Sequence, residues 1–321
     1  MSCEKNKKDI KEIIDEIIDR LRKDKQQRGY NGCLVMLSPG PGEDGNGAPG
    51  LCSAIALKLC IEAYNAENVI AITFDLDKAT DEDFSVLKLN YNISDLSIDQ
   101  LPEWVITAFE GYNRPEWIDA AGKYVQNFFG SSWEKVRITR AALRHCISLA
   151  EYGIEKVPAE IATEIRSNLL KHLTFKKGFA GAAGTNSIAA NFFPNEIIND
   201  CARISPLLNL DRTTIIEIGR YFGIEERILY APPSNGAFPI GKSEYEKKYG
   251  ANRYLTKIFK ECEWDKNLIT ILDIALHNLK NKNPIIYNLP DSITINDKLL
   301  IGLKRAEIEY NSLNNQLLFL D

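Results

Sequence analysis

The sequence lacks the features that mark membrane, nucleic-acid-binding and metal-binding proteins. No apolar run reaches the ~18–20 residues that a helix needs to span a bilayer, so we expect no membrane-embedded segment. The net charge is −5 and no block of basic residues is present, which argues against a nucleic-acid partner. The three histidines have no partner at metal-ligand spacing. The N-terminus is rich in lysine and glutamate and has no apolar signal-peptide region, so a cytoplasmic location is expected.

The cysteines show neither a zinc-type pattern nor a disulfide framework. Their number is odd, none has a partner at metal-ligand spacing, and several lie in apolar segments. This pattern is typical of reduced, buried thiols in a cytosolic protein. The cysteines are Cys3, Cys33, Cys52, Cys60, Cys146, Cys201 and Cys262.

What the chain does contain is enough apolar sequence for a sizeable core. Of its 321 residues, 45% are hydrophobic and 26% are charged. This length suits one large α/β domain with additions, or two small domains.

The stretch from Gly32 to Phe74 predicts the centre of the fold. Cys33–Leu37 is a short apolar run typical of a strand buried on both faces, and Val69–Phe74 is a second, β-branched run. Between them lie a glycine- and proline-rich loop and, from Leu51, apolar residues at helical spacing. Such a βαβ unit predicts a doubly wound, mainly parallel α/β sheet flanked by helices, with ligands bound beyond the carboxyl end of the first strand.

Apolar periodicity predicts further helices on both sides of this unit. An amphipathic helix is also expected within the insertion at 155–177. The other predicted helices are Asp9–Lys23, Trp117–Phe129, Glu134–Tyr152, one that begins near Thr213 or Thr214 and is stopped by Gly223, Leu268–Leu279 and Asp297–Asn314.

Residues Ser53–Phe74 resemble the ammonia-dependent NAD synthetases, members of the ATP-pyrophosphatases that share an S-G-G-x-D-S loop. Read without gaps, that loop falls on Ala48–Ser53, where Gly50 and Ser53 match. Because the loop normally follows its strand directly, a second register begins it at Ser38–Gly40, with an insertion behind it. Helix spacing favours the first register and strand spacing the second. The resemblance implies an adenine nucleotide alpha-hydrolase-like, Rossmann-like fold.

Later segments carry the same resemblance. Gly178–Phe193 is similar to the family's strand and G-T-G-N-K-S-E loop, and Ile204–Leu229 is similar to its I-x-P-L-x-x-L-x-K-x-x-V segment. Residues 232–250 resemble the segment that receives the dinucleotide substrate. We therefore divide the chain into a synthetase-like domain, 1–263, and a helical extension, 264–321, that packs on it.

The functional motifs of the family are poorly kept. The aspartate and glutamate that the family uses to hold magnesium fall on Cys52 and Ser187, and a lysine falls on Asn195. A thiolate is a soft ligand that suits magnesium poorly. Glu43 and Asp44 could replace the lost carboxylates if the insertion folds back onto the loop. Cys52 has two interpretations, a buried helix-capping thiol or a nucleophile activated by the helix N-terminus.

The resemblance implies a ligase that adenylates a carboxylate with ATP and passes the acyl group to ammonia or an amine. It further implies a homodimer that acts on a small-molecule carboxylate or dinucleotide, with Mg²⁺ as the metal that the family uses. The alternative is a catalytically silent nucleotide-binding or assembly module of the same fold. Arg137 and Arg140 are three residues apart and are expected on one helix face. The implied catalytic residues are Cys52, Ser187 and Arg137; the nucleotide-binding residues are Ser38, Gly40, Gly50, Leu51, Ser53, Thr73 and Thr185; the substrate-binding residues are Arg140, Phe193, Ser234 and Glu244.

Overall fold

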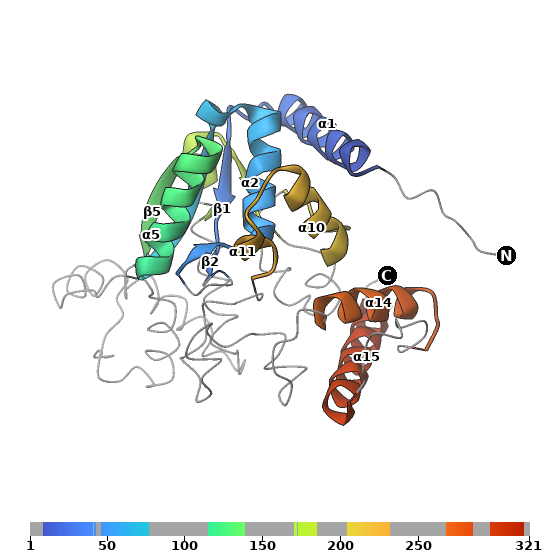
Figure 1. Cartoon of the computed structure of the whole chain (residues 1–321). Coiled ribbons are helices and arrows are strands. Elements are labelled where there is room, and N and C mark those ends of the chain that lie inside the picture. Colours follow the sequence, from blue (N-terminus) through green and yellow to red (C-terminus); the bar gives the residue numbers. More distant parts are fainter. Residues whose placement is uncertain are drawn as a thin grey trace, which may run out of the picture.

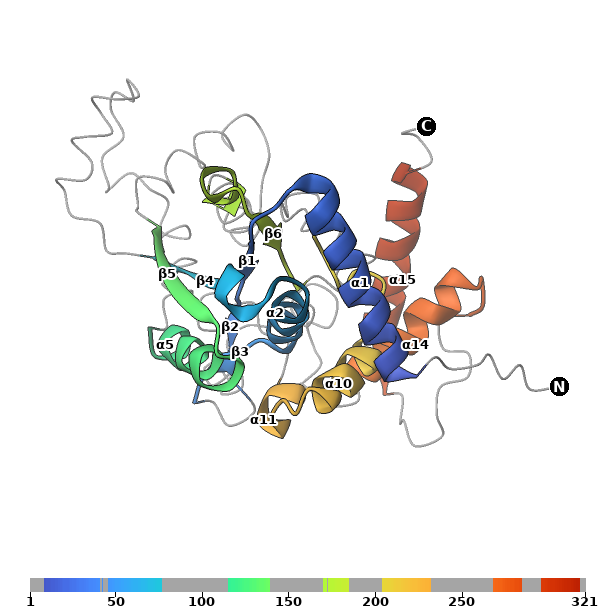
Figure 2. The ribbon, with the colours of Figure 1, turned by 90° about the horizontal axis from the view of Figure 1, so that it is seen from above.

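A parallel sheet forms the centre of the protein (Figures 1 and 2). The computed structural model describes residues 9–40, 42, 46–76, 115–138, 170–171, 173–184, 204–231, 268–284 and 296–317. The sheet has the order β5-β4-β1-β6, and each neighbouring pair is parallel. Its strands are β1 (Cys33–Met36), β4 (Val69–Leu76), β5 (Ser132–Ile138) and β6 (Ala180–Ala182).

The strand order creates a switch point beside β1. The chain runs outward from β1 through β4 to β5, then returns to the other side of β1 with β6. An isolated parallel bridge between Ala182 and Ile204 extends the sheet beyond β6. In open α/β sheets, ligands bind at the carboxyl ends of the strands where the order reverses. We therefore expect a ligand site at the carboxyl ends of β1 and β6. The predicted α/β fold is confirmed.

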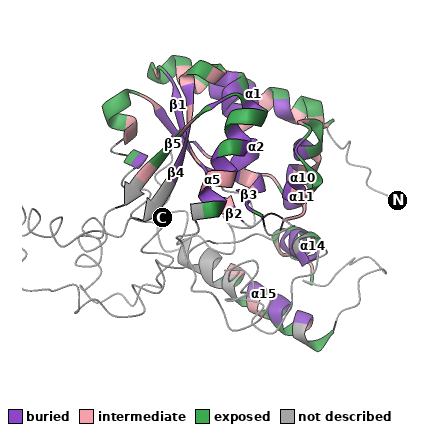
Figure 3. Ribbon diagram, turned by 60° about the vertical axis from the view of Figure 1, so that its left-hand side comes forward, coloured by how far each residue is buried: buried purple, intermediate pink, exposed green. Residues whose placement is uncertain are grey.

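Helix α2 (Leu51–Tyr64) is apolar on nearly every side, as expected for a helix that is covered all round. Cys52, Lys58 and Glu62 are the only residues of this helix that are more than slightly accessible. The sheet lies under α2, while α1 (Ile10–Arg28) and α10 (Arg212–Tyr221) pack against its other sides. The buried colouring of α2 and β1 in Figure 3 marks the same core.

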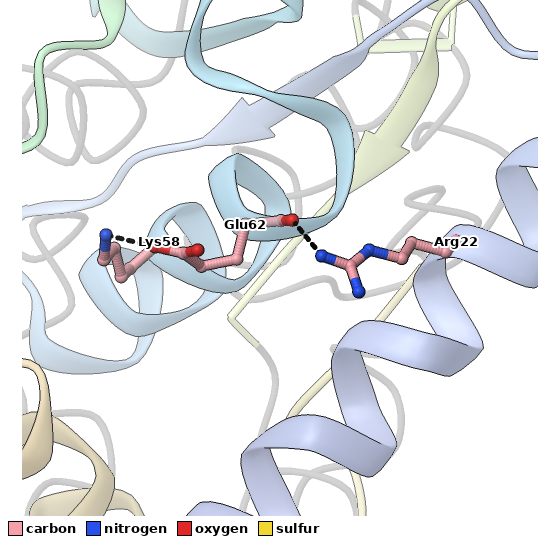
Figure 4. Close-up of polar contacts among 3 residues, drawn as sticks. All are labelled: Arg22, Lys58 and Glu62. Carbon is pink, nitrogen blue, oxygen red and sulfur yellow. Dashed lines mark hydrogen bonds and ion pairs between the residues drawn. The ribbon is translucent and has the colours of Figure 1, made fainter.

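Helix α1 follows the predicted amphipathic pattern and extends it to Arg28. The side chain of Asp9 caps its first turn, and Gly29 ends it in the left-handed conformation at φ 67°. The C-terminal half of α1 is fixed to α2 by a hydrogen bond from Arg22 Nη2 to the carbonyl oxygen of Glu62, at 3.0 Å (Figure 4). The Glu62 carboxylate pairs with Lys58 one turn away.

Helices also cover the rest of the sheet. Helix α5 (Pro115–Tyr124) continues into a π-helical turn, Val125–Phe129, which matches the predicted helix at Trp117–Phe129. Residues 170–171 and 173–177 are helical and lie across the sheet from α2 (Figure 2). A Cβ on Gly181 of β6 would lie within 3.5 Å of Leu170, so this helical stretch contacts the sheet closely.

The predicted helix at Glu134–Tyr152 is wrong for its first five residues, because 134–138 belong to β5. The ladder pairs all of β5 with β4, in a register that places Arg137 opposite Asp75. This pairing satisfies backbone groups along an edge of β4 that a helix would leave open, and Val136 and Ile138 are β-branched. Arg137 is therefore a strand residue and does not share a helix face with Arg140, which lies outside the described residues.

The remaining helices agree with the sequence pattern. The predicted helices at Leu268–Leu279 and Asp297–Asn314 are α14 (Leu268–Lys280) and α15 (Asp297–Leu317). Helix α10 is capped by Asp211, whose carboxylate accepts from the Thr214 amide at 2.7 Å, so neither predicted threonine supplies the cap. A short helix, α11 (Glu226–Leu229), follows it, and a 3-10 turn at Ala66–Asn68 precedes β4. None of the described helices is long and apolar enough to cross a membrane.

Candidate functional site

A small hairpin joins β1 to α2 at the carboxyl end of the sheet (Figure 1). Its strands are β2 (Pro39–Gly40) and β3 (Ala48–Pro49), which pair antiparallel. The glycine- and proline-rich insertion is therefore an ordered arm where its two strands meet. After β3 the chain turns at Gly50 and enters α2 directly.

The hairpin brings the two candidate loop registers together. The Gly50 amide donates to the Ser38 carbonyl at 2.7 Å, and the Ser53 hydroxyl donates to the Gly50 carbonyl at 2.9 Å. The same hydroxyl accepts from the Ser38 amide at 3.3 Å. Ser38 thus lies beside Gly50 and Ser53, although eleven residues separate it from Gly50 in the sequence. Strand spacing favoured the register that begins at Ser38, and helix spacing favoured the register that contains Gly50 and Ser53. In the structure these residues belong to one hydrogen-bonded turn.

Helices on both sides support the hairpin. Gly47 has φ +92°, and a Cβ there would lie 3.0 Å from both Trp117 and Ala120 of α5. A side chain at this position would be strained in backbone and crowded by the helix. Arg227 of α11 donates to the Gly47 carbonyl at 3.2 Å. These contacts fix the arm over the N-terminus of α2.

A buried arginine faces Cys52. Arg212, the first residue of α10, is 7% exposed, and its Nη1 lies 3.0 Å from Cys52 Sγ. Cys52 is the second residue of α2 and is half-buried. A guanidinium and a thiol therefore occupy the place where the resemblance puts a magnesium-binding carboxylate. Sequence reasoning missed Arg212, although the lysine of the similar family segment falls on it.

The opposite side of this turn is formed by backbone. A Cβ on Gly184, two residues beyond β6, would lie 2.6 Å from the Cys52 carbonyl carbon and the Ser53 nitrogen. Position 184 must be glycine for the two backbones to approach so closely. The end of β6 and the start of α2 thus meet at the switch point of the sheet.

Helix α14 contacts the N-terminus of α10 through Asp273. The Asp273 carboxylate accepts from the Thr213 amide at 2.9 Å and from its hydroxyl at 3.3 Å, so it caps the N-terminus of α10. Its other oxygen has no hydrogen-bond partner among the described residues. Burial raises the pKa of Asp273 from 3.8 to about 6, against the opposing effect of the α10 amides. Asp273 therefore connects the C-terminal helices to the residue that contacts Cys52.

The other predicted site residues fall into two groups. Gly40 pairs with Ala48 in the hairpin, and Leu51 is buried against α10. Thr73 is fully buried in β4, and its hydroxyl accepts from Trp133 Nε1 at 2.9 Å. The assignment of these residues to nucleotide binding stays a prediction. The predicted residues outside the described part of the chain are Glu43, Asp44, Arg140, Thr185, Ser187, Phe193, Asn195, Ser234 and Glu244.

Two other cysteines are scaffold residues. Cys33 of β1 and Cys60 of α2 are fully buried, and their sulfur atoms are 3.8 Å apart. The Cys60 thiol and burial together raise the pKa of Cys33 well above its ordinary value. The prediction of buried thiols is thus confirmed for these two, whereas Cys52 is half-buried.

Solved structures share this fold. No protein-family model matches the sequence, and no curated protein sequence matches it. The structure is similar to an NMN synthetase from Francisella tularensis, with a TM-score of 0.57, 14% identity, and coverage of 95% of this chain and 94% of that one. It is also similar to an NH3-dependent NAD synthetase from Campylobacter jejuni, solved with a nitrate ion, with a TM-score of 0.55, 15% identity, and coverage of 95% and 96%. The sequence resemblance is therefore borne out at the level of architecture: the chain has the α/β fold of the NMN and NAD synthetases.

Proposed function

We propose that this protein is an ATP-dependent ligase that adenylates a carboxylate and transfers the acyl group to ammonia or a small amine. The observation that carries the proposal is the N-terminus of α2 at the switch point of the sheet, with the buried Arg212 beside it. A helix N-terminus and a guanidinium both favour the phosphate groups of a nucleotide. The shared fold with two synthetases supports the same reaction class.

The proposed reaction has two steps. A carboxylate oxygen of the substrate attacks the α-phosphorus of ATP, the bond to the leaving pyrophosphate breaks, and an acyl-adenylate forms. Ammonia then attacks the acyl carbon, loses a proton and releases AMP. Residues of this chain would hold the phosphates through the amides at the start of α2 and the charge of Arg212.

Magnesium does not fit the described residues. Position 52 carries a thiol, and no group of three histidine, cysteine, aspartate or glutamate side chains suited to a metal is present in the described part of the chain. Hard cations such as Mg²⁺ prefer oxygen ligands. We therefore expect poor or no NAD synthetase activity under standard magnesium conditions. Loss of the two magnesium-binding carboxylates, at Cys52 and Ser187, is expected to lower the rate by a factor on the order of 10³.

The test is ATP–pyrophosphate exchange with a panel of carboxylates that includes deamido-NAD and nicotinate mononucleotide. Exchange with one of them, followed by ammonium-dependent AMP release, supports the proposal. Glutamine without ammonium should not support turnover by this chain, because the proposed acceptor is ammonia or a small amine. Turnover of deamido-NAD at the rate of an ordinary NAD synthetase would contradict the expectation of poor activity with magnesium. The double change Cys52→Asp and Ser187→Glu should raise that activity.

The second candidate function is a catalytically silent nucleotide-binding module. The thiol at Cys52 favours it, because a carboxylate that could hold a catalytic metal is missing there. Calorimetry that detects nucleotide binding, without exchange for any carboxylate, would select this alternative.

We further propose that the protein is a C2 homodimer, as the resemblance implies. Sedimentation that shows only a monomer at micromolar concentration would remove this inference.

A further inference from the structure

We infer that Cys52 is an oxidation site, at which a peroxide converts the thiol to a sulfinate that pairs with Arg212. Cys52 lies in the first turn of α2 and is half-buried. The two other cysteines in the described part of the chain, Cys33 and Cys60, are fully buried. The inference concerns the thiol itself, so it does not depend on the proposed ligase activity.

Access to solvent distinguishes Cys52 from Cys33 and Cys60. Oxidation of cysteine follows exposure and thiolate character. The sulfur atoms of Cys33 and Cys60 are 3.8 Å apart in the core, and the Cys60 thiol and burial together raise the pKa of Cys33 well above its ordinary value. A peroxide should therefore react with Cys52 before it reacts with either of them. No other thiol in the described part of the chain contacts Cys52, so the oxidation can continue past the sulfenic acid.

A buried guanidinium faces the sulfur of Cys52. Arg212 is 7% exposed, and its Nη1 lies 3.0 Å from Cys52 Sγ. No carboxylate in the described part of the chain forms an ion pair with Arg212, because the nearby Asp211 and Asp273 accept from backbone amides of α10. Sulfur is a weak acceptor, and a buried charge is costly unless an anion pairs with it. A negative charge on this sulfur would supply that partner.

The start of α2 favours the same negative charge. The Leu51 and Ser53 amides have no acceptor within the described residues, and no side chain caps this end of the helix. Amides and the positive end of the helix dipole attract anions at such a terminus. A sulfinate would carry its two oxygens on the Cys52 sulfur, in the same turn as these amides and beside the Arg212 guanidinium.

The proposed oxidation has two steps, with hydrogen peroxide as the oxidant. The sulfur attacks one peroxide oxygen, the O–O bond breaks, and the thiol proton leaves with the other oxygen as water. This step oxidises the sulfur to a sulfenic acid and reduces the peroxide. A second peroxide repeats the transfer and gives the sulfinic acid, which loses its proton to solvent and is anionic at neutral pH.

The oxidised site would differ from the reduced site in its charge. The sulfinate adds a negative charge beside Arg212, and its two oxygens suit the planar guanidinium as those of a carboxylate do. We expect this pair to stabilise the fold, because a buried guanidinium gains a charged partner. If the α2 N-terminus binds ATP, which rests on the proposed function, the oxidised protein should bind ATP more weakly. Cys52 would then act as a peroxide-sensitive switch of the site.

The first experiment treats the folded full chain with hydrogen peroxide and follows each cysteine over time by peptide mass spectrometry. We expect Cys52 to gain two oxygen atoms while Cys33 and Cys60 remain reduced. Earlier oxidation of Cys33 or Cys60, an unmodified Cys52, or a disulfide that includes Cys52 overturns the inference. The assay contains no nucleotide, so absence of ATP–pyrophosphate exchange would overturn the ligase proposal alone.

Thermal unfolding of the same samples tests the pairing with Arg212. Oxidation should raise the melting temperature of the wild type by roughly 2–4 °C. Cys52→Asp should give a similar rise without peroxide, because it places a carboxylate beside the guanidinium. Arg212→Met should lose the rise on oxidation. The matched control is Arg220→Met on the same helix, whose guanidinium contacts the Tyr230 side chain, and it should keep the rise.

Two further variants keep the test decisive. Cys52→Ser corrects for oxidation elsewhere in the chain, and peroxide should not raise its melting temperature. If Arg212→Met does not fold, Arg212→Lys replaces it and should show a smaller rise than the wild type, since it keeps the charge and loses the planar fork. An oxidised wild type whose melting temperature is unchanged or lower overturns the pairing. So does a rise of the wild-type size in Arg212→Met.

Discussion

The two parts of α2 differ sharply in what surrounds them. Its body is sealed: Ile55, Leu57 and Leu59 are fully buried between the sheet and the neighbouring helices. Its first turn contacts a buried arginine, a hairpin and the backbone of Gly184. The body gains stability from apolar burial, while the amides of Leu51 and Ser53 at the N-terminal edge have no acceptor among the described residues. One helix therefore serves both as scaffold and as the candidate site, and the two roles can be separated by mutation.

The largest effect is expected in the body. Leu57→Ala removes a fully buried side chain and leaves a cavity, so we expect the free energy of unfolding to fall by about 2–5 kcal/mol. Pyrophosphate affinity should stay unchanged, because Leu57 lies more than one turn from the site. Urea denaturation and calorimetry measure the two quantities. Ile308→Ala on α15 is the control, since Ile308 is 68% exposed and should change stability little. Equal losses of unfolding free energy in both variants would contradict the claim that the buried body of α2 stabilises the fold.

Near the N-terminal edge of α2, Asp273 should make the free energy of unfolding depend on pH. The pKa of Asp273 is raised to about 6 in the folded protein, so the folded state holds a proton that the unfolded state releases near 3.8. Stability should therefore fall as the pH rises from about 4 to about 6, and level off above it, with a total on the order of 3 kcal/mol.

Asp273→Asn removes this titration and keeps an acceptor for the Thr213 amide. Urea denaturation across this pH range should give a flatter profile for the variant than for the wild type. Asp297→Asn changes an exposed aspartate in the first turn of α15 and should leave the profile as it is. A wild-type stability that rises between pH 4 and 6, after correction by that control, contradicts the assignment.

The smallest effect tests the boundary between body and edge. Thr73→Val removes the hydroxyl that accepts from Trp133 Nε1, and the loss of one hydrogen bond should cost about 1 kcal/mol. Because the hydroxyl is fully buried and already bonded, we expect nucleotide affinity to be unchanged. A clear loss of affinity in calorimetry would instead place Thr73 in the site, as the resemblance implied.

The same contrast explains where sequence reasoning succeeded. Local apolar patterns located β1, α2 and β4 closely, because each of these elements is buried and its periodicity follows from burial alone. The pattern failed at 134–138, where five residues that fit a helical spacing pair with the edge of β4. The spacing of apolar residues in a short segment carries no information on whether that segment pairs with a distant strand, here β4.

The sequence by itself determined the βαβ centre, the glycine-rich loop beyond the carboxyl end of its first strand and the absence of a carboxylate at position 52. Only the tertiary structure decided that Ser38 and Gly50 are hydrogen-bonded across the hairpin. It also brought Arg212 to Cys52, which lies 160 residues away in the chain, and placed the Asp273 carboxylate on the amide of Thr213, the residue after Arg212. The physical reason is that burial leaves a periodic trace in the sequence, whereas a contact between a thiol and a guanidinium depends on how separate elements pack and leaves no such trace.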